Sequence, residues 1–272
     1  MIRIHSFLIG RFQAYVLEEN AFQSSFEKEF ILPQESRLAK KPIEVGFNYL
    51  LLKIDDRWLM FDAGRGTGGL MEGLSQLDIS PESIDYLFLT HSDGDHIGGI
   101  TSFPKAKIVL PEALHQLWSN SISREVLLNE FSRTPFVLRL PKEKQQAMRL
   151  GKHNFFTHYA TIDMEQKILL KQDELFLESI QFFPAPGHRT DHFGLLIKSN
   201  GETLIHCSDA LRDLEQLSNK DLITIYDSNP AKCQKTIQSI VHLSEKTNGT
   251  LFCTHYRFPG LIQSKTLMDR HY

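Results

Sequence analysis

One short segment constrains this chain more than any other, because an apolar strand runs directly into side chains of the types that bind metals. The apolar residues 87–89 are followed by four such side chains within six positions, namely His91, Asp93, Asp95 and His96. Mixed imidazole and carboxylate ligands suit a transition metal such as zinc, iron or manganese. Glycines at 94, 98 and 99 would let the backbone fold this loop tightly. The alternative is a polar turn with two solvated histidines.

Three further apolar segments also end in candidate ligands. Residues 182–187 lead to His188, residues 204–208 to Asp209, and residues 251–254 to His255. In α/β sheets, ligands gather just beyond the carboxyl ends of the strands. With the first segment, these strand ends supply enough candidate ligands for two metal ions.

Strands and helices alternate along the chain, without a repeat or a linker that would divide it. The apolar runs 49–54 and 58–61 predict a hairpin around the turn pair Asp55-Asp56. Further strands are predicted over 84–89, 175–183, 193–197, 203–206 and 250–253, and helices over 69–77 and from Pro230 to Gly249, with Ser228 or Asn229 as N-cap. This pattern predicts an α/β layered fold, and we expect residues 1–272 to form a single domain.

Residues 111–150 form a helical insertion in this pattern. Ala113, Leu114, Leu117 and Trp118 make an apolar stripe at helical spacing. The stripe is typical of a helix that packs on the main body. It is equally compatible with a lid over a substrate site.

Composition narrows the classes of partner. With 30 Lys and Arg against 33 Asp and Glu, the chain lacks the positive charge of a general nucleic-acid binder. No apolar run reaches the roughly 18 residues of a membrane-spanning helix, and the first residues do not resemble a signal peptide. The three cysteines, Cys207, Cys233 and Cys253, are too few and too far apart for a disulfide framework. We therefore expect a cytoplasmic protein with a small-molecule substrate, and neither a nucleic-acid nor a membrane partner.

The order of the candidate ligands resembles the metallo-β-lactamase superfamily. Its signature is H-x-H-x-D-H after a strand, then P-G-H, then an Asp and a final His. Asp62-Ala63-Gly64 also resembles the family's strand that ends in D-x-G. Within the superfamily, residues 103–106 and 255–260 are most similar to the branch of lactonases and methyl parathion hydrolase-like enzymes.

This resemblance implies an αββα four-layer sandwich with a dinuclear metal site. His91, Asp93 and His188 would hold the first metal, Asp95, His96 and His255 the second, and Asp209 would bridge them. Asp62 and Thr90 would orient ligand imidazoles. A hydroxide between the two metals would attack an ester, lactone or phosphoester. The catalytic residues would be Asp209, as the bridge, and Asp95, which would pass a proton to the leaving group.

Asp93 departs from the family pattern, which has a histidine at this position. It binds the first metal as a carboxylate, or leaves that metal weakly bound, or is unused; we expect it to bind. Three aspartates and a hydroxide would then cancel the charge of two divalent ions and weaken their pull on a substrate. Additional oxygen ligation also shifts the preference from zinc toward iron or manganese.

Several other residues have two interpretations. Phe12, Tyr15, Phe22 and Phe47 either line an apolar rim for the substrate or belong to the core. Arg212 and Arg257 either contact an anionic part of the substrate or form surface ion pairs. His192 is expected beside the ligands rather than among them, and Cys207 and Cys253 are expected to pack within strands.

Two other functions compete with hydrolysis. A non-haem iron enzyme of the sulfur dioxygenase type would use the same ligands for oxidation. A degenerate member would bind a ligand or a partner without catalysis, and Asp93 would then mark the lost activity.

Overall fold

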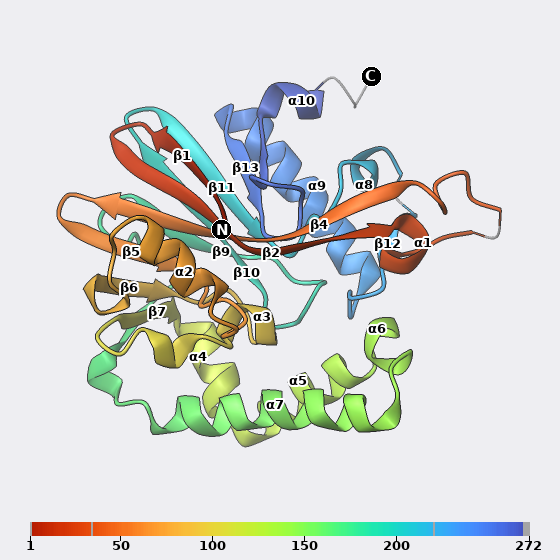
Figure 1. The fold of residues 1–272 in the computed structure, drawn as a ribbon, viewed down its shortest axis with the longest axis horizontal. Coiled ribbons are helices and arrows are strands. Elements are labelled where there is room, and N and C mark those ends of the chain that lie inside the picture. The colour runs from red at the N-terminus through yellow and green to blue at the C-terminus, as the bar shows by residue number, and fades with distance from the viewer. Residues whose placement is uncertain (1, 34, 220, 269–272) are drawn as a thin grey trace.

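Two β-sheets face each other at the centre of the computed structural model, which describes residues 2–33, 35–219 and 221–268 (Figure 1). The larger sheet has seven strands in the order β1-β2-β4-β5-β6-β7-β8: β1 Arg3–Ile9, β2 Phe12–Ser25, β4 Pro42–Ile54, β5 Arg57–Phe61, β6 Ile84–Phe88, β7 Lys107–Pro111 and β8 Lys167–Leu170. The smaller sheet has five strands in the order β14-β13-β11-β10-β9: β14 Leu261–Ile262, β13 Thr250–Cys253, β11 Glu202–Ser208, β10 Phe193–Ser199 and β9 Ile180–Pro184. Strands β3 (Phe30–Ile31) and β12 (Ile223–Thr224) form a separate pair.

The alternation of side chains along β11 shows how the layers are stacked. Successive residues of a strand point to opposite faces. Leu204 and His206 point toward the larger sheet, where the His206 ring stacks on Phe61. Ile205 and Cys207 point the other way and pack against α9 (Pro230–Thr247). Helices α2 (Gly69–Gln76) and α4 (Glu112–Ser119) pack on the larger sheet. The predicted αββα sandwich is confirmed.

The predicted helical stretch lies between β7 and β8. It consists of α4, α5 (Ser121–Ser132), α6 (Pro135–Leu138) and α7 (Lys142–Thr161), so it ends at residue 161 rather than 150. Trp118 on α4 is fully buried and meets the ring edges of Phe155 and Tyr159 on α7. Leu114 and Trp118 of the apolar stripe are therefore buried, and Leu117 is half-buried, whereas Ala113 is exposed. We call α4–α7 the helical segment.

The remaining helices are short: α1 Phe26–Glu29, α3 Gly94–Ile97, α8 Glu215–Ser218 and α10 Ser264–Met268. No helix in the described part of the chain combines the length and the apolar character that crossing a membrane requires.

Local signals located several elements correctly. The hairpin of β4 and β5 turns at residues 55–56, as predicted. Helix α9 begins at Pro230, with the Asn229 side chain accepting a hydrogen bond from the Lys232 N–H. The strand predicted over 175–183 is wrong in its first half, because β9 begins only at Ile180. Leu177 and Glu178 adopt positive φ angles of 47° and 57° and turn the chain there.

The candidate ligands meet because of the strand directions. Strands β5 and β6 run parallel in the larger sheet, and β11 and β13 run parallel in the smaller one. Strand β9 is antiparallel to β10, which is antiparallel to β11, so β9 and β11 share a direction. The carboxyl ends of these strands lead into the loops that carry the ligands.

Candidate metal centre

Six of the seven candidate ligands fall into two groups that share Asp209. Asp95, His96, Asp209 and His255 form one group, and His91, His188 and Asp209 form the other; within each group the ligand atoms lie within 4.8 Å of one another. We call them the His96 group and the His91 group.

The Asp209 carboxylate lies between the two groups. Its Oδ1 is 3.0 Å from His96 Nε2, and its Oδ2 is 3.0 Å from His255 Nε2 and 3.5 Å from His188 Nε2. This placement is what a bridging ligand would need.

Each of the four histidines presents Nε2 to the centre because its Nδ1 is engaged elsewhere. His96 Nδ1 lies 2.7 Å from Asp62 Oδ2, and His255 Nδ1 lies 2.9 Å from the Gly46 carbonyl oxygen. His188 Nδ1 lies 3.2 Å from Asp227 Oδ1, and His91 Nδ1 lies 3.0 Å from the Thr90 hydroxyl oxygen. An outer partner of this kind selects the ring orientation of a metal-binding imidazole.

The inward atoms fit a metal. Among the described residues, four buried atoms of the centre have no hydrogen-bond partner: Nε2 of His91, His96 and His255, and Oδ1 of Asp209. Buried polar atoms nearly always have a hydrogen-bond partner, so several without one at the same point fit the binding of a cation. Nitrogen and carboxylate donors are suited to a divalent first-row metal.

Asp62 and Thr90 take the positions that the sequence predicted. The Asp62 carboxylate accepts hydrogen bonds from the Thr90 N–H at 2.9 Å and from the Thr90 hydroxyl at 2.8 Å, in addition to its contact with His96. One carboxylate therefore braces ligands from both groups, through His96 directly and through Thr90 for His91.

The charges in the centre depend on neighbours as well as on burial. Burial lowers the pKa of His91 well below its usual range and favours the neutral ring. Burial also opposes charge on His96, but the carboxylates around it outweigh this and raise its pKa well above the usual value. In Asp209, burial favours protonation, yet His255 and His96 hold its pKa well below the usual range.

Close approach, rather than backbone freedom, explains the paired glycines of the ligand loop. A Cβ on Gly98 would lie 2.5 Å from the Arg65 carbonyl oxygen, and one on Gly99 would lie 2.1 Å from that of Ala63. Neither glycine has a positive φ angle. The loop after β6 therefore packs directly against the loop after β5, which carries Asp62.

Asp93 lies at the edge of the His91 group and is bound by two cations. Its Oδ2 is 3.3 Å from His188 Nε2 and 3.8 Å from His91 Nε2. Lys152 donates to its Oδ1 at 2.8 Å, and Arg189 donates to both oxygens, at 3.0 and 2.6 Å. Burial alone would raise the pKa of Asp93, but Arg189 and Lys152 hold it well below the usual range. The charge balance expected from the sequence therefore left out Lys152 and Arg189, and also Arg212, which donates to Asp209 Oδ2 at 3.0 Å.

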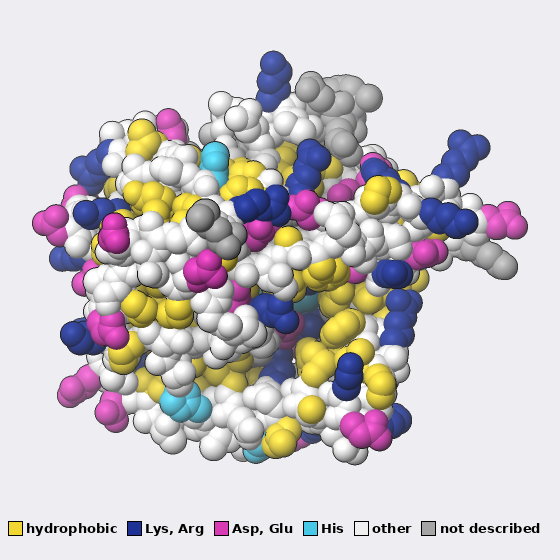
Figure 2. Space-filling view, in the orientation of Figure 1, with side chains coloured by type: hydrophobic (Ala, Val, Ile, Leu, Met, Phe, Trp, Pro, Cys, Tyr) yellow, Lys and Arg dark blue, Asp and Glu magenta, His cyan; other side chains and the backbone are white. Residues whose placement is uncertain are grey.

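A cleft of about 440 Å³ opens onto the centre. It lies between the β2–β4 ribbon and the helical segment, and Figure 2 shows this hollow with hydrophobic side chains beside it and basic ones inside. Its walls include five aromatic and three arginine side chains: Phe22, Phe47, Phe131, Phe136, Tyr226, Arg65, Arg189 and Arg212.

The four aromatic residues with two interpretations, Phe12, Tyr15, Phe22 and Phe47, divide between them. Phe22 and Phe47 line the cleft, and the Phe47 ring meets the edge of His255, with centroids 4.9 Å apart. Phe12 is buried in the core, and Tyr15 packs against Trp58.

Contacts and burial also place the arginines, His192 and the two cysteines that the sequence analysis considered. Arg212 donates to Asp209 Oδ2 at 3.0 Å and lines the cleft, whereas Arg257 is exposed. His192 engages both ring nitrogens, one near the Ala185 carbonyl oxygen and one accepting from the Asp209 N–H. It therefore supports a ligand instead of being one. Cys207 and Cys253 are buried in strands, as expected.

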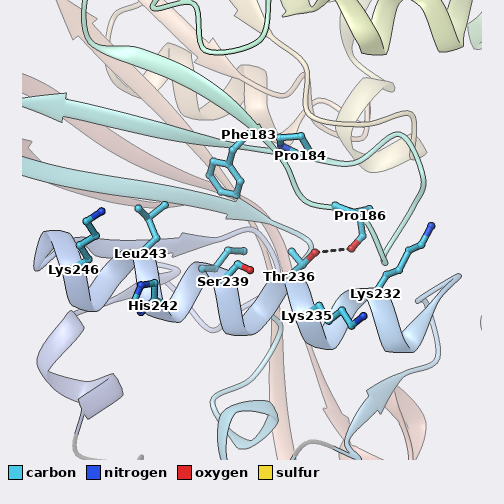
Figure 3. A pocket seen from close by; sticks show the side chains of 11 residues that line it. Phe183, Pro184, Pro186, Lys232, Lys235, Thr236, Ser239, His242, Leu243 and Lys246 are labelled. Carbon is cyan, nitrogen blue, oxygen red and sulfur yellow. Dashed lines mark hydrogen bonds between the residues drawn. The ribbon is translucent and has the colours of Figure 1, made fainter.

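A second groove, of about 730 Å³, lies away from the centre between α9 and the end of β9 (Figure 3). Phe183 and Leu243 form part of its apolar wall, and Lys232 and Lys246 lie toward the two ends of α9. Its lining contains none of the candidate ligands, so the smaller cleft is the candidate active site.

Sequence reasoning missed three residues of the centre: Asp227, Lys152 and Arg189. Arg189 directly follows the ligand candidate His188, which was an available signal. Lys152 lies in a helix far along the chain, and Asp227 precedes α9, so only the folded chain brings them to the site.

Comparisons with known proteins extend these observations. The model of the metallo-beta-lactamase superfamily matches residues 44–255. A curated relative, N-acyl homoserine lactonase AiiB from Rhizobium rhizogenes, is 25% identical over 107 residues, which span 30% of this chain and 39% of that protein.

Solved structures are similar over nearly the whole chain. AidC, a dizinc quorum-quenching lactonase, has a TM-score of 0.81 and 19% identity and covers 96% of this chain and 93% of its own. The hydrolase AbOPH has a TM-score of 0.75 and 20% identity, over 96% and 92% of the two chains. A probable metal-dependent hydrolase from Staphylococcus aureus has a TM-score of 0.67 and 17% identity, over 94% of each. At these identities the likeness establishes the fold.

Proposed function

This chain belongs to the metallo-beta-lactamase superfamily, and on that premise we propose that it is a dinuclear metal-dependent hydrolase acting on an ester, lactone or phosphoester. The observation that carries the proposal is the convergence of buried donor atoms without hydrogen-bond partners in the His96 and His91 groups. Two divalent first-row ions would supply an activated water and would stabilise negative charge that develops on the substrate.

Within this proposal, His91, His188 and Asp93 hold one ion, His96, Asp95 and His255 hold the other, and Asp209 binds both. The pairing of Nδ1 atoms with outer partners supports the histidine assignments. The position of Asp209 between the groups supports its bridging role.

Asp95 is the residue we assign to proton transfer. Its side chain is 26% exposed, whereas no other candidate ligand exposes more than 9%, and it lines the cleft. Its Oδ2 lies 3.2 Å from His255 Nε2, which orients the carboxylate. From this position Asp95 can take a proton and deliver it to a leaving group that enters from the cleft.

The cleft supports a small substrate with an apolar group and a polar reacting centre. Phe22, Phe47 and Phe136 would contact an acyl or aryl group, and Arg212 would face a polar part beside Asp209. The helical segment supplies Phe131 and Phe136 to the cleft, so we propose that this insertion covers the bound substrate. The lactonase relatives favour a lactone among the three substrate classes.

The likeness to the dizinc lactonase AidC favours zinc for this chain. The carboxylate oxygen that Asp93 offers in place of an imidazole favours iron or manganese. We propose a cytoplasmic location. Cys207, Cys233 and Cys253 are buried free thiols, and a reducing compartment keeps cysteines in this form.

The test combines metal analysis with a substrate panel. The purified protein is assayed on a lactone, an aryl ester and a phosphotriester, then stripped with a chelator and reloaded with zinc, iron or manganese. We expect hydrolysis of one class that disappears on stripping and returns on reloading. Full activity of the metal-free protein would refute the proposal. Oxygen uptake with a persulfide substrate would replace it with the oxidative function, and metal binding without turnover of any substrate would favour a non-catalytic member.

A further inference from the structure

Asp93, where the chain departs from its family, is held by two buried cations. Lys152 lies 2.8 Å from Oδ1, and Arg189 binds both oxygens through Nε and Nη2. All three residues are buried. Bidentate and charge-assisted hydrogen bonds are the strongest that side chains make. Both oxygens of Asp93 are therefore engaged before any metal arrives.

The two cations are themselves fixed in place. Arg189 Nη1 also donates to the carbonyl oxygens of His188 and Tyr226. The Phe131 ring lies against both cations, with its centroid 4.9 Å from Lys152 Nζ and 5.3 Å from Arg189 Cζ. Lys152 and Phe131 come from α7 and α5, so the helical segment contributes directly to this cluster.

The carboxylate of the other group has different neighbours. Asp95 Oδ2 faces two imidazoles, His255 at 3.2 Å and His96 at 3.8 Å. A divalent ion in the His96 group would therefore meet Asp95, which no described Lys or Arg side chain contacts; Arg212 donates instead to Asp209, which both groups share. An ion in the His91 group must share Asp93 with Arg189 and Lys152, and is repelled by both positive charges.

We propose that Lys152 and Arg189 make the two metal positions unequal, so that the His96 group binds its ion first and tightly and the His91 group binds second and weakly. This inference rests on the proposed function, since it assumes that both groups bind metal. Lys152 is then a positioning residue: it sets the affinity of the second ion through Asp93 without touching the ion.

Metal titration of the intact protein tests this directly. The metal-free chain is titrated with Zn²⁺ in competition with a chromophoric chelator, which resolves the two dissociation constants. We expect two separate binding steps. Lys152→Met removes one charge and one hydrogen bond from Asp93, so it should strengthen the second step by about tenfold, a typical effect for a residue next to a ligand, and leave the first step unchanged.

Matched variants separate this role from a merely structural one. Lys152→Arg keeps the charge and should retain the wild-type separation of the two steps. Lys144→Met removes an exposed lysine from the same helix and should change neither step. If Lys152→Met does not fold, the wild-type titration still tests whether the two metal positions are unequal. Two well-separated dissociation constants would support the inequality, and two equal ones would overturn it.

Two equal sites in the wild-type chain, or a second step that Lys152→Met leaves unchanged or weakens, would overturn the inference while leaving the proposed function intact. Absence of any Zn²⁺ binding would refute both.

Discussion

The two halves of the candidate metal centre share one loop and Asp209 but differ in the other parts of the molecule that support them. The His96 group is braced by Asp62, which follows β5, and by the Gly46 carbonyl of β4, both from the larger sheet. The His91 group shares Asp62 through Thr90, and it depends in addition on Asp227, which precedes α9, and on the Lys152–Arg189 pair around Asp93.

This difference indicates which half of the centre can change its side chains while the fold is kept. Supports within a hydrogen-bonded sheet are held by many neighbouring strands, so the geometry of the His96 group is tied to the fold itself. Supports from loops and from the helical segment can change with a few substitutions. The His91 group is the half in which this chain departs from its family.

The largest expected effect is the loss of both halves at once. Asp209→Ala removes the carboxylate that the groups share, so we expect turnover to fall by more than about a hundredfold, beyond the effect of losing an orienting partner. Elemental analysis should show loss of metal from both positions. Asp209→Asn, which keeps the shape but not the charge, serves as the comparison. Unchanged turnover in either variant would exclude a bridging role.

Removing one histidine from each half should separate them. His96→Ala should abolish the tight binding step, whereas His91→Ala should abolish only the weak one and leave about one metal per chain. The measurement is Zn²⁺ stoichiometry after dialysis. Because dialysis removes a weakly held ion, His96→Ala should retain less Zn²⁺ than His91→Ala. Equal retention by the two variants would mean that the halves are not distinct.

Smaller effects are expected from the outer partners. Asp62→Asn should weaken metal binding by roughly ten- to a hundredfold, mainly in the first step, because His96 loses its partner. Asparagine tolerates the positive φ angle of 61° at this position, which makes a backbone effect unimportant. Asp227→Asn should act on the second step instead, through His188. Chelator competition distinguishes the two, and identical effects on both steps would contradict the assignment.

The smallest predicted effect concerns the attachment of the helical segment. Trp118 Nε1 donates to Asp191 Oδ2 at 2.8 Å, and that carboxylate also accepts from the Ser92 N–H of the ligand loop. Trp118→Phe removes the donor and keeps an aromatic ring, so it should lower the free energy of unfolding by about 1–3 kcal/mol. Urea denaturation measures this. Leu138→Ala, at an exposed position on α6, should change stability by less than about 0.5 kcal/mol. Equal stability of Trp118→Phe and the wild type would argue against this anchor.

The sequence predicted those features whose signals are local. The spacing of ligands after apolar strands located the two groups, and Asn229 before Pro230 marked the start of α9. The strand expected from residue 175 was wrong because Leu177 and Glu178 turn the backbone without a glycine to signal it. The helical stretch continued to Thr161, because Gly151, directly after residue 150, lies within α7 and does not end it.

Local pattern alone thus determined the family, the layered fold and the donors available to a metal, because alternating strands and short ligand motifs are written in neighbouring residues. Only the tertiary structure decided what surrounds those donors. Asp93 was recognisable as a carboxylate in place of an imidazole, but its two cations come from residues 59 and 96 positions later in the chain. The electrostatic potential at a buried site is the sum of contributions from every charged group that folding brings near it. One segment of the sequence does not contain all of those groups.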